Sequence, residues 1–453
     1  MIVDRSRLPA PGPPRPFDFP AIEKSILPNG LGIWSVCHAQ VPVVAFALLV
    51  RRGAADDPPG KEGLAALTAD MLDEGSGNRS AIEMHELLAR LGAQLDTDIG
   101  SDAMIVAVTA LTRYADRALA LLAEIVARPA LRDSDFDRVR QLRLHRLVQL
   151  RDAPSAVADR AFIKLVYGDH PYGHTPIGTE PALAGLASAD VRVFHARAVR
   201  PELSTLIAVG DTSHHAVRQG AEDAFRAWSG DRSGIEVTER ELPHPGRINV
   251  VPRPGAPQSE LRIGQVAVSR NTPDYHALVA ANMVLGGQFV SRINLNLRED
   301  KGFTYGARTA FDFRRRPGPF VLQVSVQTSA TSRAIEESLG EITAIRGSRP
   351  ITRSELELAN AALTRGYARN FETADQIARA VMQLALYELP DDYFEQFVPR
   401  IERVTTDEAT NAMARSVDPA RLTTLVVGDL DVVGRELAGL GLGDPVVLSA
   451  EMF

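Results

Sequence analysis

The sequence predicts an α+β protein built from two copies of one unit, each of roughly 215 residues. Three segments of the first half recur in the same order in the second half, which is the pattern that a duplication leaves. They are STLIAVGD at 204–211 with TTLVVGD at 423–429, SDFD at 134–137 with SELE at 354–357, and the helical pattern before DML at 70–72 with the one before NMV at 282–284. Because each copy mixes strand and helix patterns, we expect a mixed sheet packed against helices in both.

The first copy opens with two clear signals. Residues 8–20 hold six prolines, so residues 1–21 should form an extended arm rather than a helix. Asn29-Gly30 favours the positive φ of a tight turn and predicts a hairpin.

The next elements follow from apolar patterning and breakers. The continuous apolar run 43–50 predicts a strand that is buried on both faces. The breaker-rich segment 53–63 predicts a loop, and a helix should begin near Leu64. Acidic residues from Asp133 predict the first turn of a helix that runs to about Leu150.

The polar, breaker-rich stretch 229–247 marks the boundary between the copies. We therefore expect an N-terminal domain at 22–228, a linker at 229–247 and a C-terminal domain at 248–453.

Composition narrows the function classes. The chain has 453 residues, one cysteine and a formal charge of −7, with 45% hydrophobic and 24% charged residues. One cysteine excludes a disulfide framework and a multi-cysteine metal site, and the acidic balance argues against a nucleic-acid surface. Neither a secretory apolar segment nor a membrane span of about 20 apolar residues is evident. We expect a cytoplasmic protein, although the sequence leaves a periplasmic location open.

Several motifs resemble the pitrilysin and mitochondrial-processing-peptidase family of zinc peptidases. In the first half these are LPNGL at 27–31, GAADDPPGKEGLA at 53–65, HPYG at 170–173 and IGT at 177–179. In the second half they are LGG at 285–287, SR at 291–292 and LREDKGFTY at 297–305. The resemblance implies two homologous peptidase-like domains and a clam-shell arrangement in a dimer.

The zinc motif of that family is altered here. The family carries H-x-x-E-H on the first helix, where the two histidines bind zinc and the glutamate acts as general base. The corresponding positions are Ala66, Ala69 and Asp70, and Arg146 or a close neighbour stands where the family has its third ligand, a glutamate. A catalytic zinc usually needs three protein ligands, so we expect no zinc and no other metal or cofactor in this chain.

The Arg and Tyr that the family carries in its second half are present as Arg298 and Tyr305. The resemblance implies that they bind substrate carbonyl oxygens and stabilise the oxyanion of the reaction. A helix-end arginine and a packed tyrosine are the structural alternative.

Together these features predict half of an active site. The resemblance implies the non-zinc subunit of a heterodimeric bacterial metalloendopeptidase, inactive alone, whose homologous partner supplies the zinc and whose substrates are peptides. Two alternatives remain open: a structural or assembly subunit without a catalytic contribution, and a homodimeric peptide-binding protein.

One further group of acidic residues is a weak candidate for a metal site. Asp70, Asp73 and Glu74 are spaced i, i+3 and i+4 and could hold a hard cation such as Mg²⁺, but a solvated acidic helix face is the favoured interpretation.

Overall fold

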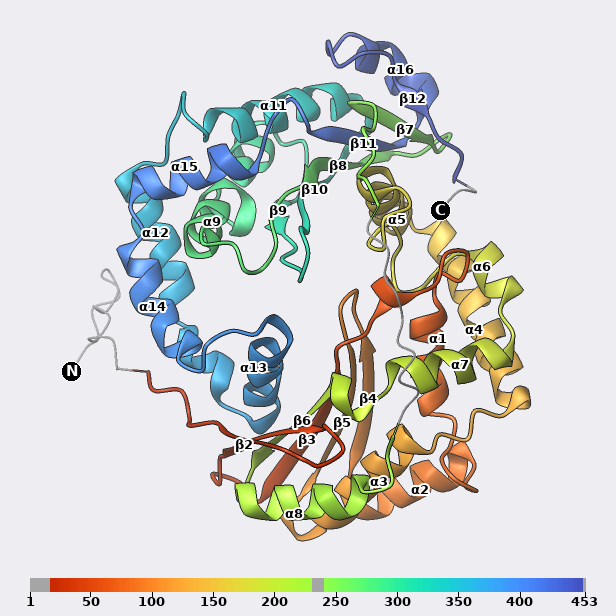
Figure 1. Ribbon diagram of the computed structural model, residues 1–453. Coiled ribbons are helices and arrows are strands. Elements are labelled where there is room, and N and C mark those ends of the chain that lie inside the picture. Colours follow the sequence, from red (N-terminus) through yellow and green to blue (C-terminus); the bar gives the residue numbers. More distant parts are fainter. Residues whose placement is uncertain (1–16, 230–239, 451–453) are drawn as a thin grey trace, which may run out of the picture.

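The computed structural model describes residues 17–229 and 240–450 and contains two six-stranded sheets (Figure 1). The first sheet has the order β1-β2-β6-β3-β5-β4. Its strands are β1 (Glu23–Ile26), β2 (Gly32–Cys37), β3 (Val43–Val50), β4 (Gln94–Ile99), β5 (Met104–Leu111) and β6 (Ser204–Gly210). β2 and β6 run parallel, and the other neighbouring strands are antiparallel.

The second sheet has the order β12-β7-β11-β8-β10-β9 and repeats five strands of the first in the same arrangement. The outermost strands differ, because β12 runs parallel to β7 whereas β1 runs antiparallel to β2. Its strands are β7 (Ile248–Pro252), β8 (Gln258–Val266), β9 (Ala307–Phe311), β10 (Pro319–Gln327), β11 (Thr423–Gly428) and β12 (Val446–Val447). β11 takes the place of β6, and β9 takes the place of the edge strand β4. The predicted duplication of an α+β unit is therefore confirmed.

Helices surround both sheets. Those of the first half are α1 (Leu64–Leu72), α2 (Ala81–Leu91), α3 (Ala115–Ala127), α4 (Asp133–Asp152), α5 (Pro154–Tyr167), α6 (Glu180–Gly185), α7 (Ser188–Ala198) and α8 (His214–Phe225). Those of the second half are α9 (Tyr275–Asn282), α10 (Arg292–Asn294), α11 (Thr331–Ala344), α12 (Arg353–Thr364), α13 (Ala374–Tyr387), α14 (Tyr393–Arg403), α15 (Thr406–Ser416) and α16 (Leu430–Ala438). Two π-helical segments, Met283–Gly287 and Leu295–Asp300, continue α9 and α10.

The local predictions for the first copy hold. β1 and β2 form an antiparallel hairpin, and Gly30 adopts a φ of +93° in its turn. β3 has the predicted bounds and is almost wholly buried. α1 begins at Leu64 because the buried carboxylate of Asp57 accepts hydrogen bonds from the backbone N–H groups of Gly63 and Ala65, at 2.7 and 2.6 Å.

Only the ends of the predicted arm and linker lie within the described chain. Residues 1–16 and 230–239 lie outside the described chain. Phe17 and Phe19, at the end of the predicted arm, pack against Phe371 in the second half, with ring centroids 4.8 and 5.3 Å from its own. β7 begins at Ile248, directly after the predicted linker.

One face of each sheet packs against helices of the same half. In the first half, buried residues of β3 and β5 pack with those of α1 and α3. In the second half, buried residues of β8 and β10 pack with those of α9 and α11.

The other face of each sheet is covered by a helix from the opposite half (Figure 1). α13, in the second half, packs Ile377, Val381 and Leu384 against β3 and β6 of the first sheet. α5, in the first half, packs Ala161 and Phe162 against β8 and β11 of the second sheet. The two halves thus exchange a helix, and each sheet depends on both.

Polar contacts reinforce this exchange. Arg262 on β8 is 4% exposed and donates hydrogen bonds to the Asp159 carboxylate of α5 at 2.7 Å and to the Ser155 carbonyl at 3.2 Å. Arg253 donates to the carbonyl oxygens of Arg151 and Asp152, at the C-terminal end of α4, at 3.2 and 2.7 Å. These arginines of the second half therefore hold both sides of the α4–α5 junction.

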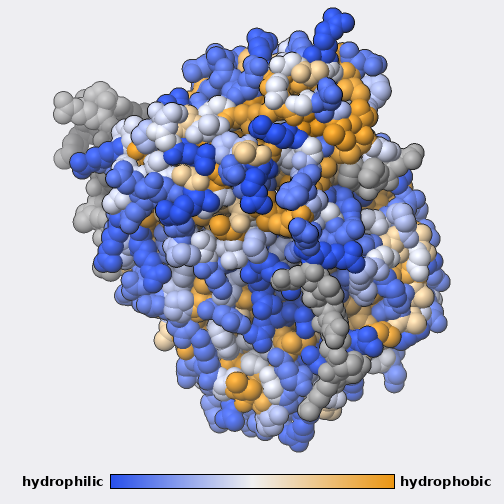
Figure 2. Space-filling view, turned by 45° about the horizontal axis from the view of Figure 1, so that its top comes forward, coloured by the Kyte–Doolittle hydropathy of each residue, from blue (hydrophilic) through white to orange (hydrophobic). Residues whose placement is uncertain are grey.

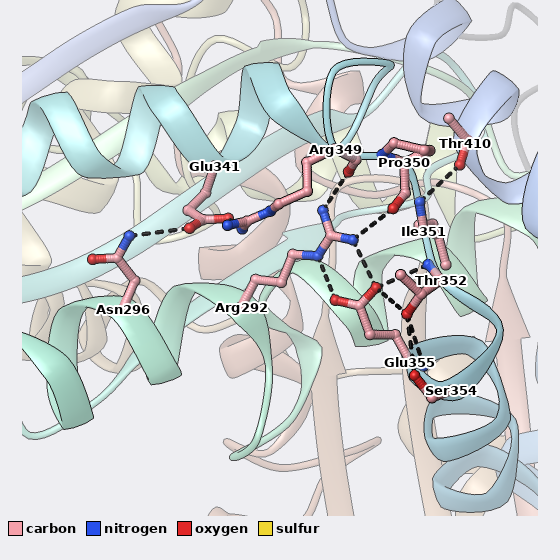
Figure 3. A network of polar contacts seen from close by, with 10 residues as sticks. All are labelled: Arg292, Asn296, Glu341, Arg349, Pro350, Ile351, Thr352, Ser354, Glu355 and Thr410. Atoms are coloured by element: carbon pink, nitrogen blue, oxygen red, sulfur yellow. Dashed lines mark hydrogen bonds and ion pairs between the residues drawn. The ribbon is translucent and has the colours of Figure 1, made fainter.

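A second polar network fixes α10 against the junction of α11 and α12 (Figure 3). The buried Arg292 guanidinium makes two hydrogen bonds to the Glu355 carboxylate, at 2.6 and 2.7 Å, and also donates to the carbonyl oxygens of Arg349 and Pro350. Burial opposes the ionisation of Glu355, but the hydrogen bonds from Arg292 and Thr352 prevail and lower its pKa to about 2.

The surface is mixed. Hydrophilic residues predominate on the face shown in Figure 2, and apolar ones gather mainly in its upper part. Within the described ranges, no helix combines the length and the apolar character that a bilayer span requires.

Leu384→Ala tests the helix exchange. Leu384 is fully buried on α13, so we expect the substitution to lower the free energy of unfolding by about 3 kcal/mol. Trp34, which packs against the same cluster from the first sheet, should report the earlier transition by fluorescence during urea unfolding. Leu358→Ala, at a leucine that is 49% exposed on α12, is the control and should change the midpoint little. A Trp34 transition that Leu384→Ala leaves unmoved would contradict the exchange.

Glu355→Gln tests the network of Figure 3. Because the folded-state pKa lies below the ordinary 4.5, the carboxylate stabilises the protein above pH 4.5 and loses that effect as the pH falls toward 2. We expect the variant to be about 2 kcal/mol less stable at pH 7. Urea unfolding at several pH values should show the difference from wild type shrinking below pH 4.5. A difference that stays constant with pH would refute the assignment.

Candidate functional site

Arg298 and Tyr305 line a single hollow of about 490 Å³ in the second half. The hollow lies between the π-helical segment Leu295–Asp300, the start of β9 and the neighbouring part of β10. The structure therefore brings the two predicted residues to one place, although seven positions separate them in the sequence.

The side chain of Arg298 is held on two sides. Its guanidinium carbon lies 3.3 Å from the ring centroid of Phe289, and its Nε donates to the Glu299 carboxylate at 2.8 Å. A guanidinium stacked on an aromatic face has few orientations left to lose on binding a ligand. Arg298 is thus a preorganised cation in the wall of the hollow.

Tyr305 is 96% exposed, between the π-helical segment and β9. Among residues 17–229 and 240–450, none makes a hydrogen bond with its hydroxyl group. An exposed tyrosine offers an apolar ring and a polar tip to a partner or ligand. Its hydroxyl can donate to a ligand without first breaking an internal bond.

Exposed apolar side chains cluster around this pair. Phe289 is 69% exposed, and Val290 and Leu295 are 44% and 45% exposed. Single exposed apolar residues are ordinary, but three within seven positions beside an exposed tyrosine form a candidate contact surface.

The predicted zinc-motif positions lie on α1. Ala66 and Ala69 are buried, and Asp70 points toward α4, where its carboxylate forms an ion pair with Arg143. Burial raises the pKa of Asp70, and the Arg143 guanidinium opposes that shift. The Asp70 carboxylate, at the last of the predicted zinc-motif positions, is therefore engaged by a cation.

Arg143, a close neighbour of Arg146 on α4, is the arginine that pairs with Asp70. The sequence pointed to Arg146 or a close neighbour; Arg146 is exposed, and within the described residues its guanidinium bonds to the Gln149 side chain alone, at 3.3 Å. Arg143 lies one turn earlier and also donates to the Pro176 carbonyl at 3.1 Å. The i, i+3 spacing of the two arginines was the available signal, because such residues share a helix face.

The acidic residues 70, 73 and 74 do not converge on one point. Glu74 forms an ion pair with Arg138, and the Asp73 carboxylate lies 3.1 Å from His85 Nε2. The described part of the chain holds no group of three or more His, Cys, Asp or Glu side chains placed to bind a metal ion.

A larger cavity of about 1080 Å³, which was not predicted, lies mainly in the first half. Its wall includes Asp57 and His174, whose carboxylate and Nε2 are 3.1 Å apart. Asp57 also caps α1, so this pair has a structural role at the start of the helix that carries Asp70.

Both halves of the chain match models of known protein families. Residues 34–180 match the family model "Insulinase (Peptidase family M16)", and residues 186–363 match the model "Peptidase M16 inactive domain". Together the two matches cover more than two thirds of the chain, in the order in which they occur here.

Among curated proteins, an uncharacterized zinc protease of Mycobacterium tuberculosis is 24% identical over 430 residues. The alignment covers 93% of this chain and 96% of the length of that protein. The uncharacterized zinc protease YmxG of Bacillus subtilis is 23% identical over 339 residues, covering 74% of this chain and 81% of its own.

Solved structures share the fold. A peptidase M16 inactive domain from Pseudomonas fluorescens superposes with a TM-score of 0.84 at 22% identity. The superposition covers 90% of this chain and 98% of that solved chain. A protease from Helicobacter pylori gives 0.83 at 19% identity, with 90% and 99% coverage. With both halves matched in order, the chain belongs to peptidase family M16, the pitrilysin family that its motifs resemble.

Proposed function

We propose that this chain is the non-zinc subunit of a two-chain M16 metallopeptidase, and that Arg298 and Tyr305 bind the peptide substrate. The observation that carries the proposal is their shared hollow, which a residue with a preorganised guanidinium and a residue with an unengaged hydroxyl both line. Membership of the family supports it, as does the match to a model named for the inactive domain.

The residues of the first half do not fit a zinc ion. At the motif positions, Ala66 and Ala69 carry methyl groups, and the single carboxylate of Asp70 is paired with Arg143. A guanidinium at a metal position opposes cation binding. Since the curated relatives are named zinc proteases, we infer that a homologous partner chain supplies the metal and the hydrolytic chemistry.

The role left to this chain is to hold the peptide. The Arg298 guanidinium and the Tyr305 hydroxyl donate hydrogen bonds to carbonyl oxygens of an extended peptide and offset negative charge that develops there. The exposed rings of Phe289 and Tyr305 add apolar contact area for peptide side chains. The clam-shell pairing of the two subunits and the cytoplasmic location remain predictions.

Arg298→Ala and Tyr305→Phe test the proposal directly. The chain would be co-expressed with a zinc-bearing homologue from the same genome, and hydrolysis of a fluorogenic peptide would be followed. We expect each substitution to lower kcat/KM by about 100-fold while the complex still forms, because each removes one donor to developing charge.

Arg353→Ala, at an exposed arginine of α12, is the matched control and should leave the rate unchanged. Full activity of both site variants in an intact complex would support the structural-subunit alternative instead. Robust activity of this chain alone with added zinc would contradict the two-chain proposal.

Arg143→Met tests the ion pair that stands at the altered zinc motif. Removing the cation leaves the Asp70 carboxylate half-buried without a partner, so the free energy of unfolding should fall by about 1 kcal/mol. Asp70→Asn in the Arg143→Met background should restore most of the loss, as urea unfolding would show. Elemental analysis of the wild-type chain, purified alone, should find far less than one zinc per chain. A stoichiometric zinc would overturn the assignment.

A further inference from the structure

Two asparagine side chains cover the outer edge of β9. The Asn294 amide pairs with the backbone of Ala307: Nδ2 donates to the Ala307 carbonyl at 2.7 Å, and Oδ1 accepts from the Ala307 N–H at 2.9 Å. Asn282 makes one such backbone bond at Thr309: its Nδ2 donates to the Thr309 carbonyl at 3.0 Å, and its Oδ1 accepts from the side-chain Oγ1 at 2.8 Å. Both amides take the place that a neighbouring strand would otherwise fill.

Asn294 also makes hydrogen bonds to residues outside β9. It is 5% exposed, and its Nδ2 also lies 3.1 Å from the Gln288 carbonyl and 3.1 Å from Ser291 Oγ. A buried amide with both ends satisfied is rigid, because any rotation leaves polar atoms without partners. Asn294 therefore ties three backbone segments to one point.

Those three segments carry the proposed peptide-binding residues. Gln288 directly precedes Phe289, on which the Arg298 guanidinium lies. Asn294 itself lies four positions before Arg298, one helical turn away. Ala307 lies two positions after Tyr305. Asn294 thus contacts or belongs to each of the segments that carry Phe289, Arg298 and Tyr305.

Tyr305 depends on its backbone for its position, because no hydrogen bond or ring contact from residues 17–229 and 240–450 holds its side chain. The turn around it is closed locally by Thr304 Oγ1, which lies 3.0 and 3.1 Å from the carbonyl and N–H of Gly306. On its N-terminal side, the Phe303 N–H donates to the Leu297 carbonyl at 2.9 Å. On its C-terminal side, Asn294 is the first anchor outside the turn.

The first half has no equivalent. At the edge strand β4, which takes the place of β9, no side chain from outside the strand bonds its backbone, as far as the structure describes the chain. Asp70, the counterpart of Asn282 in the repeat, pairs with Arg143 instead. The asparagine cover is therefore confined to the half that carries Arg298 and Tyr305, and the shared fold does not require it.

We propose that Asn294 is a positioning residue that sets the spacing of Arg298, Phe289 and Tyr305. The proposal rests on the function proposed above. It assigns Asn294 no contact with substrate: its effect is transmitted through the backbone of Gln288 and Ala307.

The test is a double-mutant cycle in the reconstituted complex. Asn294→Ala should lower kcat/KM by roughly 10- to 100-fold, and should add little once Arg298→Ala and Tyr305→Phe are present, because it acts through them. Asn282→Ala, which removes the matching cover two residues further along β9, should change kcat/KM by less than about 3-fold. Equal losses for both asparagine variants, or a full additional loss in the background lacking Arg298 and Tyr305, would overturn the proposal.

Hydrogen exchange of the chain alone separates this inference from the proposed function. In Asn294→Ala, peptides covering 301–310 should exchange at least about 10-fold faster, while those from β10 keep their protection. Unchanged exchange would overturn the tie whatever the activity shows. If Arg298→Ala and Tyr305→Phe leave the rate intact, the proposed function fails, and the exchange result still decides whether Asn294 holds Tyr305. Should Asn294→Ala not fold, Asn294→Asp, which keeps the acceptor for the Ala307 N–H, takes its place in both measurements.

Discussion

The exchange of α5 and α13 between the halves is the constraint on which the rest of the structure depends. Each sheet presents two apolar faces, and helices of its own half cover one of them. The second face would lie open to water if the opposite half did not supply its helix. The relative placement of the two halves is therefore set by core packing rather than by a surface contact, and cores tolerate little displacement.

This constraint reaches both candidate regions. α4, which carries Arg143, is followed by Ala153 and then directly by α5, and Arg253 of the second half binds the carbonyl groups at its end. The position of the Asp70–Arg143 pair is thus linked to the second sheet. On the other side, the Arg292–Glu355 network fixes the start of the helical segment that leads to Arg298 (Figure 3). In both regions a largely or fully buried guanidinium is paired with a carboxylate, which offsets the cost of burying its charge.

Much of this fold could be predicted from the sequence because the strongest signals are local or repeated. The turn at Gly30, the strand Val43–Val50 and the recurrence of the segment ending at 211 near 429 each follow from residue type and order. The helix exchange could not be predicted. The apolar positions of α5, such as Ala161 and Phe162, show that one face is buried but not which sheet buries it.

Some residues of the candidate site could likewise be predicted from the sequence, and others could not. Arg298 and Tyr305 were predicted through a family motif. They line one hollow because Tyr305 lies in the short connection between the π-helical segment that carries Arg298 and β9. On α4 the prediction could name only Arg146 or a close neighbour, because spacing along a helix identifies a face, not which of two long side chains reaches across it. The role of Asn294 was invisible as well, since a single asparagine has no pattern until its partners in a distant strand are known.

The exchange also bears on how such a chain arose. If one ancestral unit of roughly 215 residues had the same fold, its sheet would have kept one uncovered face as a monomer. Two identical copies could have closed both sheets by trading that helix, which is a self-complementary arrangement of the kind that twofold dimers use. Joining the two genes would then have turned an association between molecules into packing within one. After fusion each half was free to diverge, and the halves now differ at α1 and α9, where Asp70 pairs with Arg143 but its counterpart Asn282 bonds to Thr309.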